Sequence, residues 1–279
     1  MADARTDLYA VLGQPIGHSL SPTMHNRAFT HAGLNAVYLA FETDNIGAAL
    51  AAVRTLGIRG VSITIPHKVA ILDLVDRLDP DAQNIGALNT VVNRDGQLTG
   101  YNTDGRGAVL ALAEHVDLDG RPVALIGAGG AARAVGYALK SAGARVIVFN
   151  RSDARGRHLA HDLEVDFRPL GRFEAARCRV LVNTTPVGMT PNTGRMPVEV
   201  CGLPASAVVM DIVYNPLETE LLRQARRRGC TVISGVSMFV YQGALQFELW
   251  TGRRAPLQVM RQAVLDALKP SSVFLEGPS

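Results

Sequence analysis

The sequence predicts an α/β protein with two domains built on parallel sheets. Short apolar runs alternate with longer segments of helical periodicity along most of the 279 residues, which is the pattern of repeated strand–helix units. A glycine-rich turn at 127–132 lies between a strand-like run and a helical segment, which indicates a Rossmann-type unit. Hydrophobic residues make up 47% and charged residues 19% of the chain, so the composition favours packed cores and excludes a disordered protein.

Charge and cysteine content narrow the classes of partner. The net charge is +3, which is too small on a chain of this length to bind a nucleic acid backbone, so no nucleic acid partner is expected. No apolar run approaches the ~20 residues that span a bilayer, and the first residues lack a signal-peptide core. We therefore expect a cytoplasmic protein without membrane contact. Cys178, Cys201 and Cys230 are widely spaced, which predicts free thiols in the core and no metal site.

Apolar runs predict the strands in chain order. They are residues 9–13, 37–42, 60–65, 90–93, 122–126, 144–149, 179–183, 208–213 and 231–234. We expect a first domain over 1–104 and a second over 105–237, with a connecting helix at 104–115. The segments 237–250 and 257–268 read as two helices with no strand after them, so we expect 238–279 to pack back on the first domain.

Local signals mark three helix starts. Ser21 before Pro22 and Asn215 before Pro216 are pairs typical of an N-cap and first helical position. Pro66 predicts a helix that would hold Lys68 in its first turn. A lysine near the positive end of a helix is repelled in its charged form, which favours proton exchange near neutral pH.

The turn at 127–132 has the form of a dinucleotide fingerprint. Gly127 permits a tight turn, Gly129 lets the backbone approach a pyrophosphate, and Ala132 allows close packing of helix on sheet. The N–H groups of the helix start, over Gly127, Ala128, Gly129, Gly130 and Ala131, are available to an anion. The alternative is a glycine turn that merely packs a helix on a strand.

The end of the next strand decides the type of dinucleotide. An acidic residue there would bind a ribose 2′-hydroxyl, whereas this chain has Asn150, Arg151, Ser152 and Arg155. Two guanidinium groups and a hydroxyl suit a 2′-phosphate, so we expect NADP rather than NAD. Asp153 leaves open an arrangement in which a carboxylate accepts the ribose hydroxyls.

Polar residues of the first half suit a small polyhydroxylated acid. Ser19 and Ser21 precede a helix, where two hydroxyls beside free N–H groups form a site for a carboxylate. Ser21 could equally be an ordinary cap, and Asp104 an ordinary first-turn acid. Together with Lys68 and with Asn89 at the edge of a strand, these groups fall where βα turns can converge. With a dinucleotide site in the same chain, they indicate hydride transfer to a small acid.

Nine motifs in order along the chain closely resemble the shikimate dehydrogenase family. They are GQPIGHSLSP at 13–22, SITIPHK at 62–68, GALNT at 86–90, NTDG at 102–105, GAGGAA at 127–132, NRS at 150–152, NTTPVGM at 183–189, DIVYNP at 211–216 and YQG at 241–243. The resemblance implies an NADP-dependent enzyme that interconverts 3-dehydroshikimate and shikimate in aromatic amino-acid biosynthesis. It also implies a substrate-binding first domain and a cofactor-binding second domain.

The resemblance implies a role for individual residues as well. Lys68 and Asp104 would be the catalytic pair. The substrate carboxylate would be bound by Ser19, Ser21 and Tyr214, and the ring oxygens by Thr64, Lys68, Asn89, Asp104 and Gln242. The cofactor would be bound by the turn at 127–131, by Asn150, Arg151, Ser152 and Arg155 around the 2′-phosphate, by Thr184 and Thr185 along its length, and by Met210, Val213 and Gly235 near the nicotinamide.

Three departures from the family pattern loosen the inference about substrate. Ser62 stands where many relatives have Asn, Ser152 replaces a frequent Thr, and Ser237 occupies a place often held by Gly. A quinate or dual quinate/shikimate dehydrogenase is the nearest alternative, and Ser21 favours shikimate. A sensor that binds the metabolite without catalysis is a second alternative, against which Lys68 and Asp104 argue. The expected partner is a small-molecule substrate, and the chain is expected to be a monomer or a homodimer.

Overall fold

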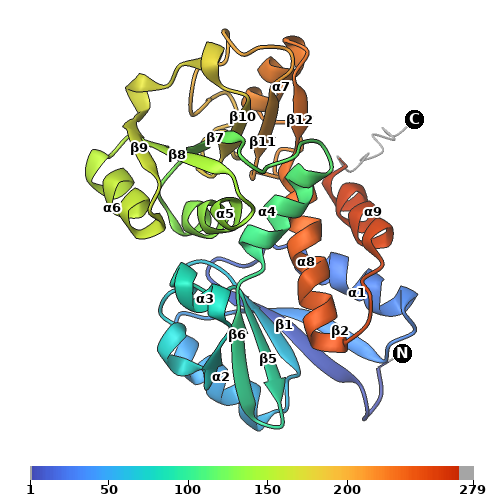
Figure 1. Ribbon diagram of the computed structural model, residues 1–279. Coiled ribbons are helices and arrows are strands. Elements are labelled where there is room, and N and C mark those ends of the chain that lie inside the picture. The colour runs from blue at the N-terminus through green and yellow to red at the C-terminus, as the bar shows by residue number, and fades with distance from the viewer. Residues whose placement is uncertain (1, 270–279) are drawn as a thin grey trace, which may run out of the picture.

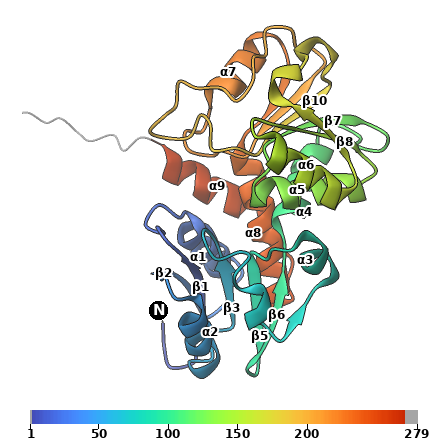
Figure 2. The same ribbon diagram turned by 90° about the vertical axis from the view of Figure 1, so that its left-hand side faces the viewer.

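The computed structural model describes residues 2–269, which form two lobes, each built around a six-stranded sheet. Figure 1 shows the amino-terminal sheet in the lower lobe and the second sheet in the upper lobe. Helices α4 (Asp104–Ala113) and α8 (Gly235–Thr251) lie side by side between the lobes, as the turned view in Figure 2 also shows. The predicted α/β class with two sheets is confirmed.

The lower sheet is mixed, so the expectation of purely parallel sheets is wrong for this lobe. Its strands are β1 (Asp7–Gly13), β2 (Ala36–Glu42), β3 (Gly60–Ile63), β4 (Arg77–Leu78), β5 (Thr90–Arg94) and β6 (Gln97–Tyr101), in the order β2-β1-β3-β5-β6-β4. Strand β5 is antiparallel to both β3 and β6. The cause of the β5–β6 hairpin is a two-residue turn at Asp95 and Gly96, whose φ angles of 52° and 88° reverse the chain.

Two faces of the lower sheet carry separate cores. Side chains alternate along β1, so Tyr9 and Val11 pack under α1 (Ser21–His31), α8 and α9 (Leu257–Leu268), whereas Ala10 and Leu12 pack under α2 (Ile46–Thr55). The two carboxyl-terminal helices therefore return to the first lobe, as expected. Helix α3 (Pro80–Ile85) lies near strand β6, which is next to the edge strand β4.

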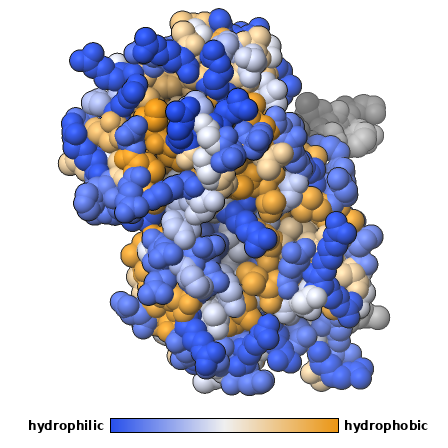
Figure 3. All heavy atoms as spheres, in the orientation of Figure 1, coloured by the Kyte–Doolittle hydropathy of each residue, from blue (hydrophilic) through white to orange (hydrophobic). Residues whose placement is uncertain are grey.

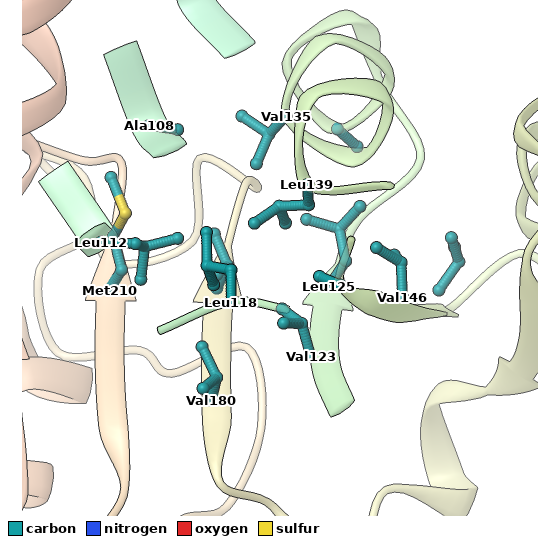
Figure 4. Packing of buried hydrophobic residues seen from close by; sticks show 14 of the residues in the cluster. Ala108, Leu112, Leu118, Val123, Leu125, Val135, Leu139, Val146, Val180 and Met210 are labelled. Atoms are coloured by element: carbon teal, nitrogen blue, oxygen red, sulfur yellow. The ribbon is translucent and has the colours of Figure 1, made fainter. Parts of the chain in front are cut away.

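The upper sheet is parallel throughout. Its strands are β7 (Pro122–Ile126), β8 (Arg145–Asn150), β9 (Asp166–Pro169), β10 (Val180–Asn183), β11 (Val208–Asp211) and β12 (Thr231–Ile233), in the order β12-β11-β10-β7-β8-β9. Helix α4 packs on one face with α5 (Gly130–Ser141) and α6 (Asp153–Leu163); Figure 4 shows Leu139 next to Leu125 and Leu112 next to Met210. Helix α7 (Glu220–Arg227) covers the other face.

The nine predicted strands are all present, but three further strands were not predicted. Strands β4 and β9 have only two and four residues, and β6 contains polar residues and a glycine. Such short or polar strands lack the apolar run on which the prediction depends. They are recognised only by their pairing with neighbouring strands.

Two predicted helix starts are wrong. Helix α7 begins after Thr219 rather than at Asn215, because the Thr219 hydroxyl accepts a hydrogen bond from the N–H of Leu222 and donates one to buried Asp211. No helix follows Pro66: residues 65–71 form turns, followed by a short 3₁₀-helix, Leu72–Leu74. The carbonyl of Lys68 accepts the N–H of Leu88 instead of continuing a helix.

The cysteine prediction holds for two of three residues. Cys178 and Cys230 are buried, whereas Cys201 is exposed, because it lies in a turn before β11 rather than in a strand.

On the face shown in Figure 3, hydrophilic side chains cover the outer rim of both lobes, and apolar side chains are broken into separate patches. Within residues 2–269, no helix is long and apolar enough to cross a bilayer.

Candidate active site

A cavity of about 290 Å³ lies between the two lobes. Residues of both lobes line it, from the loops after β1 and β3 to the start of α8. All eight residues predicted to be catalytic or to bind substrate are in this lining: Ser19, Ser21, Thr64, Lys68, Asn89, Asp104, Tyr214 and Gln242. The fold therefore brings together groups that are up to 223 residues apart in the chain.

Lys68 and Asp104 are in direct contact at this cavity. The Nζ atom of Lys68, in the turn after β3, lies 2.6 Å from Oδ2 of Asp104, the first residue of α4. The Lys68 side chain is 29% exposed and that of Asp104 is 11% exposed. Lys68 is not at a helix start, so no helix dipole acts on its amine as expected. The helix dipole acts instead on the Asp104 carboxylate, which the positive end of α4 stabilises.

Asn89 holds the second oxygen of the same carboxylate. Its Nδ2 atom donates to Oδ1 of Asp104 at 2.8 Å and also approaches Oε1 of Gln242 at 3.3 Å. Asn89 ends the loop before β5 and is almost fully buried. Asp104 thus has one oxygen on the buried Asn89 amide and the other on the Lys68 amine, an arrangement suited to holding that amine in place.

The serine pair differs from the predicted cap. Ser21 is the first residue of α1 rather than its N-cap, and the backbone N–H of Ser21 donates to Oγ of Ser19 at 3.3 Å. The N-cap position is Leu20, which has no capping side chain. Both serine side chains therefore remain available at the cavity, beside the positive end of the helix.

Tyr214 adds a third hydroxyl from the upper lobe. Its ring lies against Phe239, with centroids 5.0 Å apart. Burial raises the pKa of the Tyr214 phenol, so this group remains a neutral donor at physiological pH. Three hydroxyl groups at one cavity can donate to the oxygens of a carboxylate.

Three polar lining residues, His18, Ser62 and Gln246, lie outside the predicted set, and Ser62 and Gln246 contact each other. Ser62 precedes Thr64 by two residues on β3, and Gln246 follows Gln242 by one helical turn on α8. Ser62 donates to Oε1 of Gln246 at 2.8 Å and accepts from the Tyr38 hydroxyl at 2.6 Å. The two-residue and four-residue spacings from predicted site residues are the signals that could have found them.

The glycine turn after β7 has the form needed for a dinucleotide phosphate. Gly127 has φ +119°, and a Cβ there would lie 2.7 Å from Oγ1 of Thr184, so only glycine fits without strain. Gly129 precedes α5 and has open space beside it, as does Gly130. The turn lies at the carboxyl end of β7, next to β10, where the chain order of the sheet reverses. This switch point is the usual place for a bound dinucleotide.

The turn after β8 presents the groups predicted to surround a 2′-phosphate. Arg151, Ser152 and Arg155 are exposed, and Nδ2 of Asn150 donates to the carbonyl of Ser152 at 2.8 Å. Asp153, the possible competitor, is the first residue of α6 and lies 3.8 Å from Arg157. Two exposed guanidinium groups fit a dianionic phosphate, so the residues present fit NADP.

The remaining predicted cofactor residues differ in accessibility. Gly235 and Ala131 line the cavity, and Thr185 lies half-buried at the end of β10. Thr184 and Val213 are buried at strand ends, and Met210 packs in the core of the upper lobe with no exposed surface. The side chain of Met210 therefore has no access to a ligand in this arrangement.

Comparison with protein-family models identifies three matching regions. Residues 11–91 match the shikimate dehydrogenase substrate binding domain, residues 109–184 match the shikimate/quinate 5-dehydrogenase model, and residues 235–265 match the shikimate 5′-dehydrogenase C-terminal domain. The first and last regions are the two that meet in the lower lobe.

Individual proteins are similar over nearly the whole chain. The shikimate dehydrogenase (NADP(+)) of Moorella thermoacetica is 47% identical, covering 96% of each chain. A Thermus thermophilus shikimate 5-dehydrogenase, solved with NADP(H) and shikimate, is 41% identical with TM-score 0.88, covering 94% of this chain and 100% of that one. A Corynebacterium glutamicum quinate dehydrogenase, solved with NAD, is 32% identical with TM-score 0.89, covering 94% and 99%.

Proposed function

Because this chain belongs to the shikimate dehydrogenase family, we propose that Lys68 and Asp104 transfer the proton in its NADP-dependent interconversion of 3-dehydroshikimate and shikimate. The observation that carries this proposal is the 2.6 Å contact between the two side chains at the cavity. Bound NADPH supplies the hydride, so the chain has to supply orientation and a proton.

Lys68 acts as general acid in the direction of reduction. Negative charge develops on the carbonyl oxygen, and the ammonium group of Lys68 donates a proton to it; in the reverse direction the neutral amine takes the proton back. Asp104 accepts a hydrogen bond from Lys68 and keeps its amine at the cavity. A positioned acid of this kind typically contributes a factor of about 10²–10⁴ to the rate.

The carboxylate of the substrate is bound by the three hydroxyls of Ser19, Ser21 and Tyr214. All three residues line the cavity, and their side chains are neutral hydroxyls that do not repel a carboxylate. Thr64, Asn89 and Gln242, together with the catalytic pair, bind the ring oxygens. This assignment is supported by the lining itself, which contains hydroxyls that suit the carboxylate as well as amide and charged side chains that suit the ring oxygens.

The cofactor lies along the upper lobe. The turn at 127–131 binds the pyrophosphate through backbone N–H groups, and Asn150, Arg151, Ser152 and Arg155 surround the 2′-phosphate. Thr184, Thr185, Val213 and Gly235 lie along the path to the cavity, and Met210 contributes only through the core beneath it. We assign residues 105–237 to the NADP domain and 1–104 with 238–279 to the substrate domain; of these, residues 1 and 270–279 lie outside the part of the chain that the structure describes.

One chain supplies every residue of this proposed site, so a monomer or a homodimer would both be active. The three free thiols are compatible with a reducing compartment, and we place the enzyme in the cytoplasm, with no nucleic acid or membrane partner.

Replacement of Lys68 tests the proposal directly. Lys68→Ala should lower kcat for 3-dehydroshikimate by about 10²–10⁴ while the KM for this substrate changes only a few-fold. Lys140→Ala is the matched control, because Lys140 pairs with Glu164 on the surface of the upper lobe. A Lys68→Ala enzyme with near-normal turnover would contradict the role of Lys68 as general acid.

A quinate dehydrogenase is the second candidate function, because the chain is similar to the Corynebacterium enzyme. Parallel assays with NADH and with quinate separate that activity from NADP-dependent shikimate dehydrogenase activity.

A further inference from the structure

A chain of buried hydrogen bonds runs beneath the cavity. The hydroxyl of Tyr38 on β2 donates to Oγ of Ser62, and Ser62 donates to Oε1 of Gln246 on α8. Nε2 of Gln246 then donates to Oγ1 of Thr90 at 2.9 Å and to the backbone carbonyl of Asn89 at 3.1 Å. These hydrogen bonds therefore connect the edge strand β2 to Thr90, the residue next to Asn89.

The backbone carbonyl of Asn89 determines which way the side-chain amide of Gln246 faces, and therefore the direction of the neighbouring hydrogen bonds. The carbonyl of Asn89 can only accept, so the amide nitrogen of Gln246 has to face it, and its oxygen has to face Ser62. Because Thr90 accepts from Gln246, its single hydroxyl proton is free to point to Oδ1 of Asn89, which lies 2.8 Å away. Burial raises the pKa of the Tyr38 phenol, so the first donor in the chain stays protonated.

The far end of the chain orients the amide that touches Asp104. Oδ1 of Asn89 accepts from Thr90 and also from the backbone N–H of Thr103 at 2.8 Å. With these two donors and the Thr103 hydroxyl at 3.2 Å on its oxygen, the Asn89 amide can turn only its nitrogen toward Asp104 Oδ1, at 2.8 Å. Flipping this amide would bring two acceptors together and leave a buried polar group without a partner.

We propose that Thr90 is a positioning residue for the Lys68–Asp104 pair and acts through the side-chain amide of Asn89. Thr90 has no exposed surface and is not among the residues that line the cavity, so its effect on the reaction does not arise from contact with substrate. The inference rests on the proposed roles of Lys68 and Asp104.

The hydroxyl of Thr90 can be removed without a change of shape. Thr90→Val should lower kcat/KM for shikimate about tenfold, the effect of losing one buried hydrogen bond, and leave the KM for NADP+ unchanged. Thr90→Ser keeps the hydroxyl and should return kcat/KM to within about twofold of wild type. Thr99→Val on the neighbouring strand β6, outside the cavity lining, is the matched control and should have no effect.

A double-mutant cycle distinguishes positioning from a general structural effect. In an Asn89→Ala background, Thr90→Val should lower kcat/KM by less than about twofold, because its target is gone. An equal loss in both backgrounds, or a Thr90→Ser enzyme as slow as Thr90→Val, would overturn the proposal. If the Val variant does not fold, Thr90→Ala compared with Thr90→Ser decides in the same way. Lys68→Ala in the same assays reports separately on the proposed proton transfer.

Discussion

Gly107 on α4 lies directly against the backbone of Gln242 on α8. A Cβ atom on Gly107 would lie 2.8 Å from the Gln242 nitrogen and 2.9 Å from its Cβ. Two residues earlier, a Cβ on Gly105 would lie 2.2 Å from the carbonyl oxygen of Ala134 on α5. Helix α4 is therefore held between a helix of each lobe at distances that only glycine allows.

Gly107→Ala should move α8 and with it Gln242. We expect a loss of about 1–3 kcal/mol in the free energy of unfolding, as for other overpacked sites, and a higher KM for shikimate. Gly47→Ala on α2 is the control, because the nearest atom to its added Cβ is 3.6 Å away; it should stabilise by about 0.5–1 kcal/mol. Urea titration and steady-state kinetics measure both, and equal behaviour of the two variants would contradict the argument.

Arg151 and Arg155 should determine the preference for NADP+. Arg151→Ala or Arg155→Ala removes a charge-assisted contact worth about 1.5–3 kcal/mol, so the KM for NADP+ should rise at least tenfold and that for NAD+ should change little. Arg157→Ala is the control, since this guanidinium lies over the Phe167 ring, 5.0 Å from its centroid. A parallel rise for both coenzymes would show that the arginines do not read the 2′-phosphate.

Asp211 makes the fold less stable as the pH rises. Burial raises the pKa of Asp211 to about 6, above the ~3.9 of an unfolded chain. The protonated Asp211 side chain contributes fully to the free energy of unfolding below about pH 4. This contribution is lost as the pH rises through 6, which lowers the free energy of unfolding by roughly 2–3 kcal/mol. An asparagine at position 211 can accept hydrogen bonds from Asn183 and Val213 and donate one to Thr219, which are the three partners of Asp211. Asp211→Asn should therefore be more stable than wild type at pH 8 and similar at pH 4, by urea denaturation.

His25 has the opposite dependence on pH. Burial lowers the pKa of His25 to about 3, and among the described residues neither ring nitrogen has a hydrogen-bond partner. The unfolded chain takes up a proton near pH 6.5, so stability is lost as the pH falls from there toward 3, by about 1.4 kcal/mol per unit. His25→Phe keeps the stacking on Tyr38, where the rings are 4.6 Å apart. The variant should lose less stability than wild type between pH 6.5 and 4; parallel curves would refute this.

The active-site residues were largely predictable because they occur in short motifs. Ser19, Lys68, Asn89 and Asp104 were all named from residue type and from positions at the ends of strands or the starts of helices, and all four line the cavity. The glycine turn was equally recognisable, since Gly127 needs a positive φ angle that other residues rarely adopt. In each case the signal extends over no more than ten residues.

Other features required the folded chain. The antiparallel pairing of β5 with β3 depends on partners that local periodicity does not reveal. The turn at Lys68 replaces the predicted helix because its carbonyl accepts the N–H of Leu88, which arrives from a later loop. Met210 was predicted near the cofactor but packs in the core.

The amino-acid sequence by itself determined the α/β class, the strand–turn–helix unit for a dinucleotide, and most of the chemically active side chains, because spacing and conformational preference act over a few residues. The tertiary structure decided how those side chains are oriented. Thr90 and Gln246 are 156 residues apart, and their hydrogen bond exists only because α8 returns to the first lobe. Directional bonds of this kind depend on distances below about 3 Å, which folding alone establishes.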